Sequence, residues 1–474
     1  DFEKINDIRT ASKMDVSKLS NKNSSIHDMA HKLQVNNILK GEVSFSDNSM
    51  NLKIKMFSTF KGDYVFNESY ECGRDNVNFL RTKVLTRIMK EFDLEPPTHI
   101  LESLSREMSE NSIALEKYHQ GKYYIQRLSS REDVEKAHGL FKEACELDYH
   151  FIEALAEYGL TFQKLGEFDE AEEYLEKALQ QAEHEKYDVG IAYIYNYMGI
   201  LYYNWGKMKL SLKYYERSIE FQNKLNDKFQ EAKTLGNVSE HYISQGNINK
   251  ALVCLEQSRD IKIDLEETQS LAYTFAQFGN LYFYLEDFSK SSENIERTVT
   301  IADEKNMLQL KSQNLVTLAE CYSNLGLFDK GLFYIKEALP MLKEFDNVMA
   351  IGRSYMYRGK IMFNQGQYKA AIKDLKESIE ELQMCDQKKL VLIANIELAI
   401  VHICDIGHKS AEKCLNNAFK LGKRIKGTEV FVLLAKMVQA SFNNDKNPDS
   451  LYAEIETYKK EPVTYRHWYF LSLS

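Results

Sequence analysis

Two histidines with helical spacing are the most suggestive chemical motif in the chain. His27 and His31 stand four residues apart in HDMAH, so a helix would place them on one face, as metal-binding pairs require. A metalloprotease helix needs a glutamate after the first histidine as general base, and Asp28 occupies that place. Both histidines also lie off the apolar stripe of their segment. A solvated surface pair is therefore favoured over a metal site, and we expect neither metal nor cofactor.

No other segment has the pattern of a catalytic site. The sequence contains neither GxGxxG nor GxxxxGK[ST], and Gly121-Lys122 lacks a glycine-rich loop before it, so no phosphate cradle is expected. It offers no nucleophile–base constellation and none of the paired metal-binding aspartates of a nucleotide cyclase. We therefore expect a non-catalytic chain, while whether the parent protein is an enzyme stays open.

Composition limits the class of protein. The 474 residues are too many for one ordinary core, and the formal net charge of -9 disfavours nonspecific binding of nucleic acid. No run of 18 apolar residues could span a membrane, and no signal-peptide pattern opens the chain. Seven dispersed cysteines without CxxC indicate free thiols and a cytoplasmic location. Because the chain starts at Asp1, without methionine, we expect further residues upstream.

A pattern that repeats every 40 residues covers most of the sequence. The helices of this repeat must therefore position any functional side chain there. A small residue is followed four places later by an apolar one and seven places later by another small one, which defines one helix face. An earlier helix with a small residue and, in most copies, an aromatic one precedes each anchor, and glycine marks the turn between the two helices in five of the seven copies. The seven anchors are Ala171, Ser211, Ala251, Ser291, Gly331, Ala371 and Ala411.

This pattern resembles the tetratricopeptide repeat, whose first helix carries small and aromatic residues and whose second carries Ala–aromatic–Ala. The resemblance implies a mostly α protein, a right-handed superhelical solenoid with a period of 40. We assign about eight repeats to residues 98–426. Residues 427–474 are assigned to a degenerate repeat and C-terminal cap, near Leu451 and Ile455.

The segment before Pro96-Pro97 has a different pattern. An amphipathic helix at 24–35 is followed by strand-like runs at 36–45, 51–60 and 64–72, and then by a helix at 76–94. The runs IHDMAHKLQVNNILKGEV and LKIKMFSTFKGDYVFNESYE resemble the TolB-amino-terminal-like, FlgO-like α/β domain, with Phe66 where tryptophan is usual. We therefore assign residues 1–97 to a small α/β domain, truncated at its start. In that family the unit often follows a class III adenylate/guanylate cyclase domain.

The first helix of each repeat lines the concave surface in this fold, and its facing side chains are mostly amides and tyrosines. Amides can hydrogen-bond a peptide backbone, and tyrosines add contact area at low entropic cost. The alternative is that these tyrosines simply pack between helices. The predicted protein-binding groove comprises Tyr193, Asn196, Tyr203, Asn204, Asn237, Tyr273, Gln277, Asn280, Tyr284, Gln313, Asn324, Arg353, Tyr357, Lys360 and Asn364.

Three functional hypotheses follow. The first is a bacterial regulatory region that binds a protein or peptide in the groove and controls an upstream signalling domain such as a nucleotide cyclase. The second is a free-standing scaffold that assembles a protein complex. A hidden enzyme within residues 1–97 is the third and least favoured. The identity of the ligand, a homodimer, and the choice between the groove and the convex face stay open.

Overall fold

The computed structural model describes residues 25–33, 35–45, 49–73, 77–95, 101, 106, 108–127, 131–385, 387–405, 408–425 and 428–442. The predicted cap near Leu451 and Ile455 lies outside them. The described chain is mostly helical, with one small sheet near its start. It divides into a first unit (Asp1–Tyr242 with Asn249–Thr268) and a second unit (Ile243–Ile248 with Gln269–Ser474).

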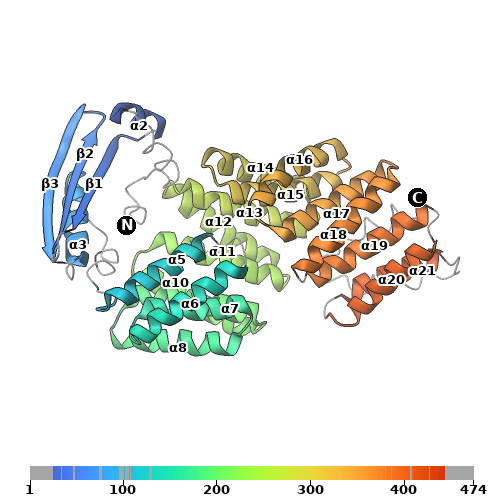
Figure 1. Cartoon of the computed structure of the whole chain (residues 1–474), viewed down its shortest axis with the longest axis horizontal. Helices are drawn as coiled ribbons and strands as arrows, with labels where there is room; N and C mark the ends of the chain where they lie inside the picture. Colours follow the sequence, from blue (N-terminus) through green and yellow to red (C-terminus); the bar gives the residue numbers. More distant parts are fainter. Residues whose placement is uncertain are drawn as a thin grey trace. The chain divides into compact units, whose positions relative to one another are not determined.

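A three-stranded antiparallel sheet follows a short helix, as the alternating pattern predicts. The elements are α2 (Ile26–Leu33), β1 (Asn37–Phe45), β2 (Ser49–Ser58), β3 (Asp63–Gly73) and α3 (Val77–Lys90). The central strand is β2 (Figure 1). Gly41 of β1 lies opposite Ile54 of β2.

The core of this small domain lies between the sheet and α3. Ile54, Met56 and Phe66 are buried in one cluster with Leu80 and Ile88 of the helix, because alternate strand residues point to the same face. Phe66 is 3% exposed and so belongs to the centre of this core.

Eight helix pairs and one further helix make up the rest of the described chain. We call the first helix of each pair A and the second B. The pairs are α5 (Ser112–Arg127) and α6 (Arg131–Leu147), α7 (Ile152–Leu165) and α8 (Phe168–His184), α9 (Asp188–Asn204) and α10 (Met208–Lys224), α11 (Lys228–Ser244) and α12 (Ile248–Asp264), α13 (Thr268–Tyr284) and α14 (Phe288–Glu304), α15 (Leu308–Asn324) and α16 (Phe328–Glu344), α17 (Val348–Asn364) and α18 (Tyr368–Met384), and α19 (Lys388–Cys404) and α20 (His408–Gly422), followed by α21 (Glu429–Phe442).

The repeat anchors join each B helix to its A helix, as the spacing predicts. Ser211 Oγ donates a hydrogen bond to the carbonyl of Gly199 at 2.9 Å, and Ser291 Oγ donates to the carbonyl of Gly279 at 2.8 Å. A Cβ atom at Gly199 would lie 2.4 Å from the ring of Tyr215, so only glycine allows this packing. The small residues therefore let the two helices approach closely.

The two turns of each repeat differ in sequence but share a left-handed residue. The A-to-B turn uses glycine in five repeats, as at Gly206 with a φ of 77°. The B-to-A turn uses non-glycine residues instead, which the sequence does not reveal. These residues recur every 40 positions at Lys186, Asn226, Glu266, Asn306 and Asp346, with φ between 50° and 56°.

The A helices form one layer within each unit. In the first unit α7 contacts α9, and in the second α15 contacts α17 and α17 contacts α19. The B helices α8, α16 and α18 contact the A helices on either side of them, and Figure 1 shows these alternating pairs. Each A helix packs with one side against its B helix. We call the opposite side of the A helices of a unit the A face.

Candidate functional site

The two histidines of α2 lie at the surface. Both are exposed, and the ring of His27 packs edge-on against Phe57 with centroids 5.0 Å apart. Among the residues that the structure describes, no group of three or more His, Cys, Asp or Glu side chains could hold a metal ion.

Two other features match the sequence. All seven cysteines are free, and Cys254, Cys321 and Cys414 are buried. Within the described part of the chain, no helix has the length and apolar character needed to cross a membrane.

The second unit presents part of the predicted groove to solvent. Tyr273 and Asn280 on α13, Gln313 on α15 and Asn364 on α17 are exposed, and Tyr273 retains 53% of its accessible surface. They come from three successive A helices, so their hydrogen-bonding groups share one face. Gln277, Tyr284, Asn324 and Tyr357 are half-buried beside them.

The two cationic side chains of the predicted groove already contact other groups of the protein. Arg353 forms an ion pair with Glu320, with Nη2 2.7 Å from Oε1. Lys360 is only 8% exposed and donates to Asn324 Oδ1 at 3.2 Å. Both side chains were predicted to line the groove; their charges are compensated by partners within the protein, as charges this close to the interior require.

Burial also brings Lys360 close to a second acid. Desolvation lowers the pKa of Lys360 to about 7, although Glu397 and Glu320 oppose that shift. Desolvation raises the pKa of Glu397 on α19 to about 7, against the effect of Lys360. This pair changes its protonation near neutral pH and is part of the interior of the second unit.

Two predicted groove residues of the first unit hydrogen-bond each other. Asn237 Nδ2 on α11 donates to Asn196 Oδ1 on α9 at 3.0 Å. Tyr203 is half-buried near the ring of His241, and Asn204 at the end of α9 is exposed. Tyr193 is half-buried, and its hydroxyl is shielded from solvent.

A buried polar cluster on three A helices was not predicted from the sequence. Glu157 of α7 is 4% exposed, and its Oε1 accepts from Lys122 Nζ of α5 at 2.5 Å. The same oxygen accepts from the hydroxyl of Tyr197 on α9 at 3.0 Å. Glu153, one turn earlier on α7, is 8% exposed. We call Tyr118, Lys122, Glu153, Glu157, Tyr193 and Tyr197 the acidic cluster.

An arginine from the segment before the repeats closes one side of this cluster. Arg106 Nη1 lies 2.7 Å from Glu153 Oε1, and its Nε lies 2.9 Å from Glu185 Oε2. The guanidinium also lies over the ring of Tyr187, 4.5 Å from its centroid. Burial raises the pKa of Glu153, and Arg106 opposes that effect.

Three polar atoms of the acidic cluster are left without a hydrogen-bond partner. They are Oε2 of Glu153, Oε2 of Glu157 and the hydroxyl of Tyr193, all shielded from solvent. Buried polar atoms of this kind usually have a partner in the protein, in water or in a ligand.

A sequence signal for this cluster does exist. Glu153 and Glu157 interrupt the otherwise apolar run FIEALAEYGL, on the side of α7 that faces other A helices. From the sequence, paired carboxylates are expected on solvated helix faces. Glu172 and Glu173 are indeed less buried than Glu153 and Glu157.

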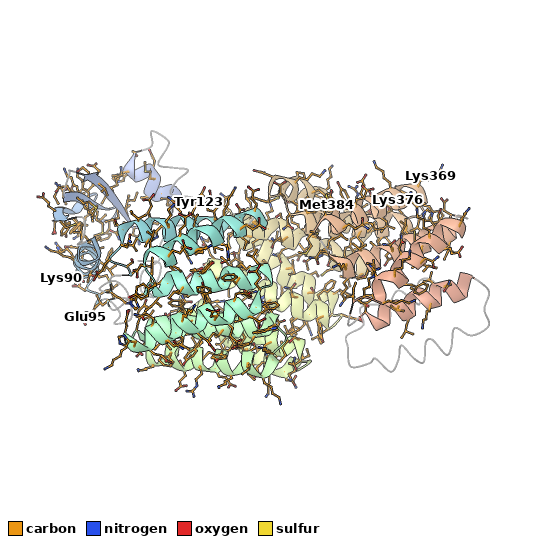
Figure 2. All side chains as sticks on the ribbon, turned by 60° about the horizontal axis from the view of Figure 1, so that its bottom comes forward. Lys90, Glu95, Tyr123, Lys369, Lys376 and Met384 are labelled. Atoms are coloured by element: carbon orange, nitrogen blue, oxygen red, sulfur yellow. The ribbon has the colours of Figure 1, made fainter. Side chains whose placement is uncertain are left out.

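A shallow hollow of about 510 Å³ lies along the first A helix. Its lining comes from α5 alone: Glu116, His119, Gln120, Tyr123 and Tyr124. Figure 2 shows Tyr123 among the side chains at the surface of the molecule. Because one helix supplies every wall, this is an open helix face and not a groove between repeats.

Comparison with known proteins identifies the type of repeat. Residues 151–224, which contain α7 to α10, match the tetratricopeptide repeat family. No curated protein sequence matches the chain.

Solved structures share the fold at low sequence identity. A Signal Transduction ATPase with Numerous Domains from Pyrococcus horikoshii, which has a tetratricopeptide repeat sensor, is 15% identical with a TM-score of 0.52. The match covers 77% of this chain and 55%, about half, of that protein. Aspartyl phosphate phosphatase F from Bacillus subtilis is 14% identical with a TM-score of 0.50, covering 75% of this chain and 95% of that one. The helical part is thus a tetratricopeptide-repeat array.

Proposed function

We propose that this chain is a non-catalytic protein-interaction and sensing region that binds a peptide or protein segment on the A face. The supporting observation is the set of exposed side chains Tyr273, Asn280, Gln313 and Asn364 on three successive A helices. Amide groups donate and accept hydrogen bonds, and an exposed tyrosine provides area that a bound peptide can cover. The match to tetratricopeptide repeats supports the same role.

We further propose that binding controls a signalling domain encoded upstream, such as a nucleotide cyclase. In an array each repeat contacts mainly its neighbours, so a ligand that bridges several A helices changes their spacing and can move what is attached. The tetratricopeptide repeat sensor named for the Pyrococcus horikoshii protein supports a sensing role. The alternative is a free-standing scaffold in the cytoplasm, which would hold two partners at once.

Selection from a displayed peptide library tests the binding surface. Peptides selected on the whole chain should bind the double variant Asn280→Ala/Gln313→Ala at least about tenfold more weakly than the wild type. Each lost hydrogen bond contributes about 1 kcal/mol to binding. The matched control is Lys369→Ala/Lys373→Ala, which removes exposed side chains of B helix α18. Equal affinity for the A-face variant would remove the A face as the binding surface.

A second experiment separates the regulator from the scaffold. In the full gene product, adding the selected peptide should change the output of the attached domain, and Asn280→Ala/Gln313→Ala should abolish that response. A gene product with no output domain would exclude the regulator, and simultaneous capture of two partners would support the scaffold.

A further inference from the structure

The acidic cluster of the first unit combines two features that a purely structural ion pair does not need. Glu153 and Glu157 are more than nine-tenths buried, yet each uses only its Oε1 atom for the contacts described above. Both Oε2 atoms and the Tyr193 hydroxyl have no partner. Three acceptor sites therefore remain inside one cluster.

The geometry brings these acceptors together. Glu153 and Glu157 are one turn apart on α7, and Tyr193 and Tyr197 are one turn apart on α9, which contacts α7. Side chains four residues apart on a helix lie about 5–6 Å from each other at Cβ, so one small group can reach both carboxylates. Burial raises the pKa of Tyr193, and the charge of Glu153 adds to that effect.

The site is rich in charge. Three carboxylates, of Glu153, Glu157 and Glu185, form ion pairs with Arg106 and Lys122, and Lys164 also interacts electrostatically with Glu157. A carboxylate so poorly exposed to water is stabilised by each further positive or hydrogen-bonding partner.

Aromatic rings enclose the same site. The rings of Tyr193 and Tyr197 meet edge to face with centroids 5.6 Å apart. Burial raises the pKa of Tyr118, with further contributions from the Glu157 and Glu153 carboxylates. Tyrosine faces attract cations, as Tyr187 already does with Arg106.

We propose that the acidic cluster is a binding site for a primary ammonium group of a peptide partner. An ammonium has three N–H donors, which match the three acceptor atoms without a partner, and its positive charge favours a position beside two buried carboxylates. The source is a lysine side chain or a peptide amino terminus. This inference rests on the proposed peptide-binding function and adds the chemistry of one contact.

Two partly exposed side chains mark the side from which we expect a ligand to enter. Arg106 and Lys122 pair with the carboxylates, and their side chains are 16% and 29% exposed. An entering ammonium would exchange with one of these cations or bind the remaining acceptor atoms beside it. The chain's own two cations thus show the chemistry that the site accepts.

Binding of short synthetic peptides to the whole chain tests this proposal. The probes are N-acetylated, C-amidated Gly-Gly-Lys-Gly-Gly, the same peptide with norleucine, the same with trimethyllysine, and the norleucine peptide with a free amino terminus. Binding is measured by saturation-transfer NMR and calorimetry at millimolar peptide. We expect binding of the lysine peptide or the free amino terminus, and at least about tenfold weaker binding of the acetylated norleucine and trimethyllysine peptides, which lack the N–H donors.

Variants locate the binding. Glu157→Gln and Tyr193→Phe should each lower the affinity for the ammonium-bearing peptide at least severalfold. The matched control Glu172→Gln, which alters a carboxylate that accepts from the Tyr202 hydroxyl outside the cluster, should leave affinity unchanged. Tyr193→Phe removes only an oxygen without a partner, so it stays informative if Glu157→Gln fails to fold.

Two results would overturn the proposal: equal binding of the lysine and acetylated norleucine peptides, or an ammonium preference that both cluster variants retain. Either would leave the cluster as an internal polar contact filled by water. Its failure is distinguishable from failure of the proposed function, because peptides that depend on Asn280 and Gln313 would still bind the second unit.

Discussion

Both units contain buried charge on their A helices, but they compensate it in different ways. Glu157 in the first unit and Glu397 in the second occupy the same position of the 40-residue repeat. Glu157 receives hydrogen bonds from Lys122 and Tyr197, whereas Glu397 interacts electrostatically with the buried Lys360. The first cluster keeps acceptor atoms without a partner, while the acids Glu320 and Glu397 of the second are balanced by Arg353 and Lys360. A glutamate at the same position of the repeat can therefore belong to a cation-binding cluster in one unit and to a pair that titrates near neutral pH in the other.

The largest expected effect is the pH dependence of the second unit. The raised pKa of Glu397 makes its contribution to stability fall as pH rises from about 4.5 to 7. The lowered pKa of Lys360 makes its contribution fall as pH drops from about 10.5 to 7. Lys360→Met/Glu397→Gln should therefore stabilise the protein most near pH 7, by about 1–4 kcal/mol.

Urea unfolding at pH 5, 7 and 9 measures this effect as the difference between the double variant and the wild type. A difference that does not change with pH would contradict the assigned titration of the pair.

Single substitutions at the shared repeat position should separate the two clusters. At pH 8, Glu157→Gln should lower the free energy of unfolding by about 2 kcal/mol, because Lys122 loses its anionic partner. Glu397→Gln should be neutral or stabilising, because it removes a poorly solvated carboxylate. Equal losses for the two variants, measured by urea unfolding, would show that the clusters do not differ as described.

Two tyrosines one turn apart test the surplus acceptors of the first unit. Tyr197→Phe should cost about 1.5–3 kcal/mol, since its hydroxyl donates to the charged Glu157. Tyr193→Phe should be neutral or raise stability by about 1 kcal/mol, because that hydroxyl has no partner. Thermal unfolding of both variants provides the measurement, and a similar loss for Tyr193→Phe would mean that its hydroxyl is bonded.

The smallest effect should be the same in both units. Lys186 and Asp346 hold equivalent left-handed positions in the B-to-A turns, with φ of 55° and 50°. Replacing either by glycine should stabilise by about 0.5–1 kcal/mol, because only glycine adopts this conformation without strain. Unequal gains in thermal unfolding would indicate that the units also differ in backbone strain.

The fold was largely predictable because it depends on local periodicity. The anchors at Ser211 and Ser291 and the glycines opposite them fall where the repeat spacing predicts, and the strand around Gly41 pairs as its alternation suggests. The left-handed residue of the B-to-A turn was missed, since Lys186 and its equivalents share no side-chain type.

The candidate site was predictable only in part. Position in the repeat correctly suggested exposure for Tyr273 and Gln313, but it could not reveal that Lys360 is bonded inside the second unit. The acidic cluster was missed because its buried state depends on Arg106 and Lys122, which come from outside the regular 40-residue frame. Contacts between distant segments decide whether a charged side chain faces water or the interior.

Photo-crosslinking of a library-selected peptide to the whole chain tests the central claim most directly. A peptide with a photoreactive residue at each position in turn should attach to A helices, namely α9 and α11 in the first unit or α13, α15 and α17 in the second. Mass spectrometry of the digested product identifies the attached residues. Attachment confined to the B helices or to the sheet β1–β3 would contradict binding on the A face.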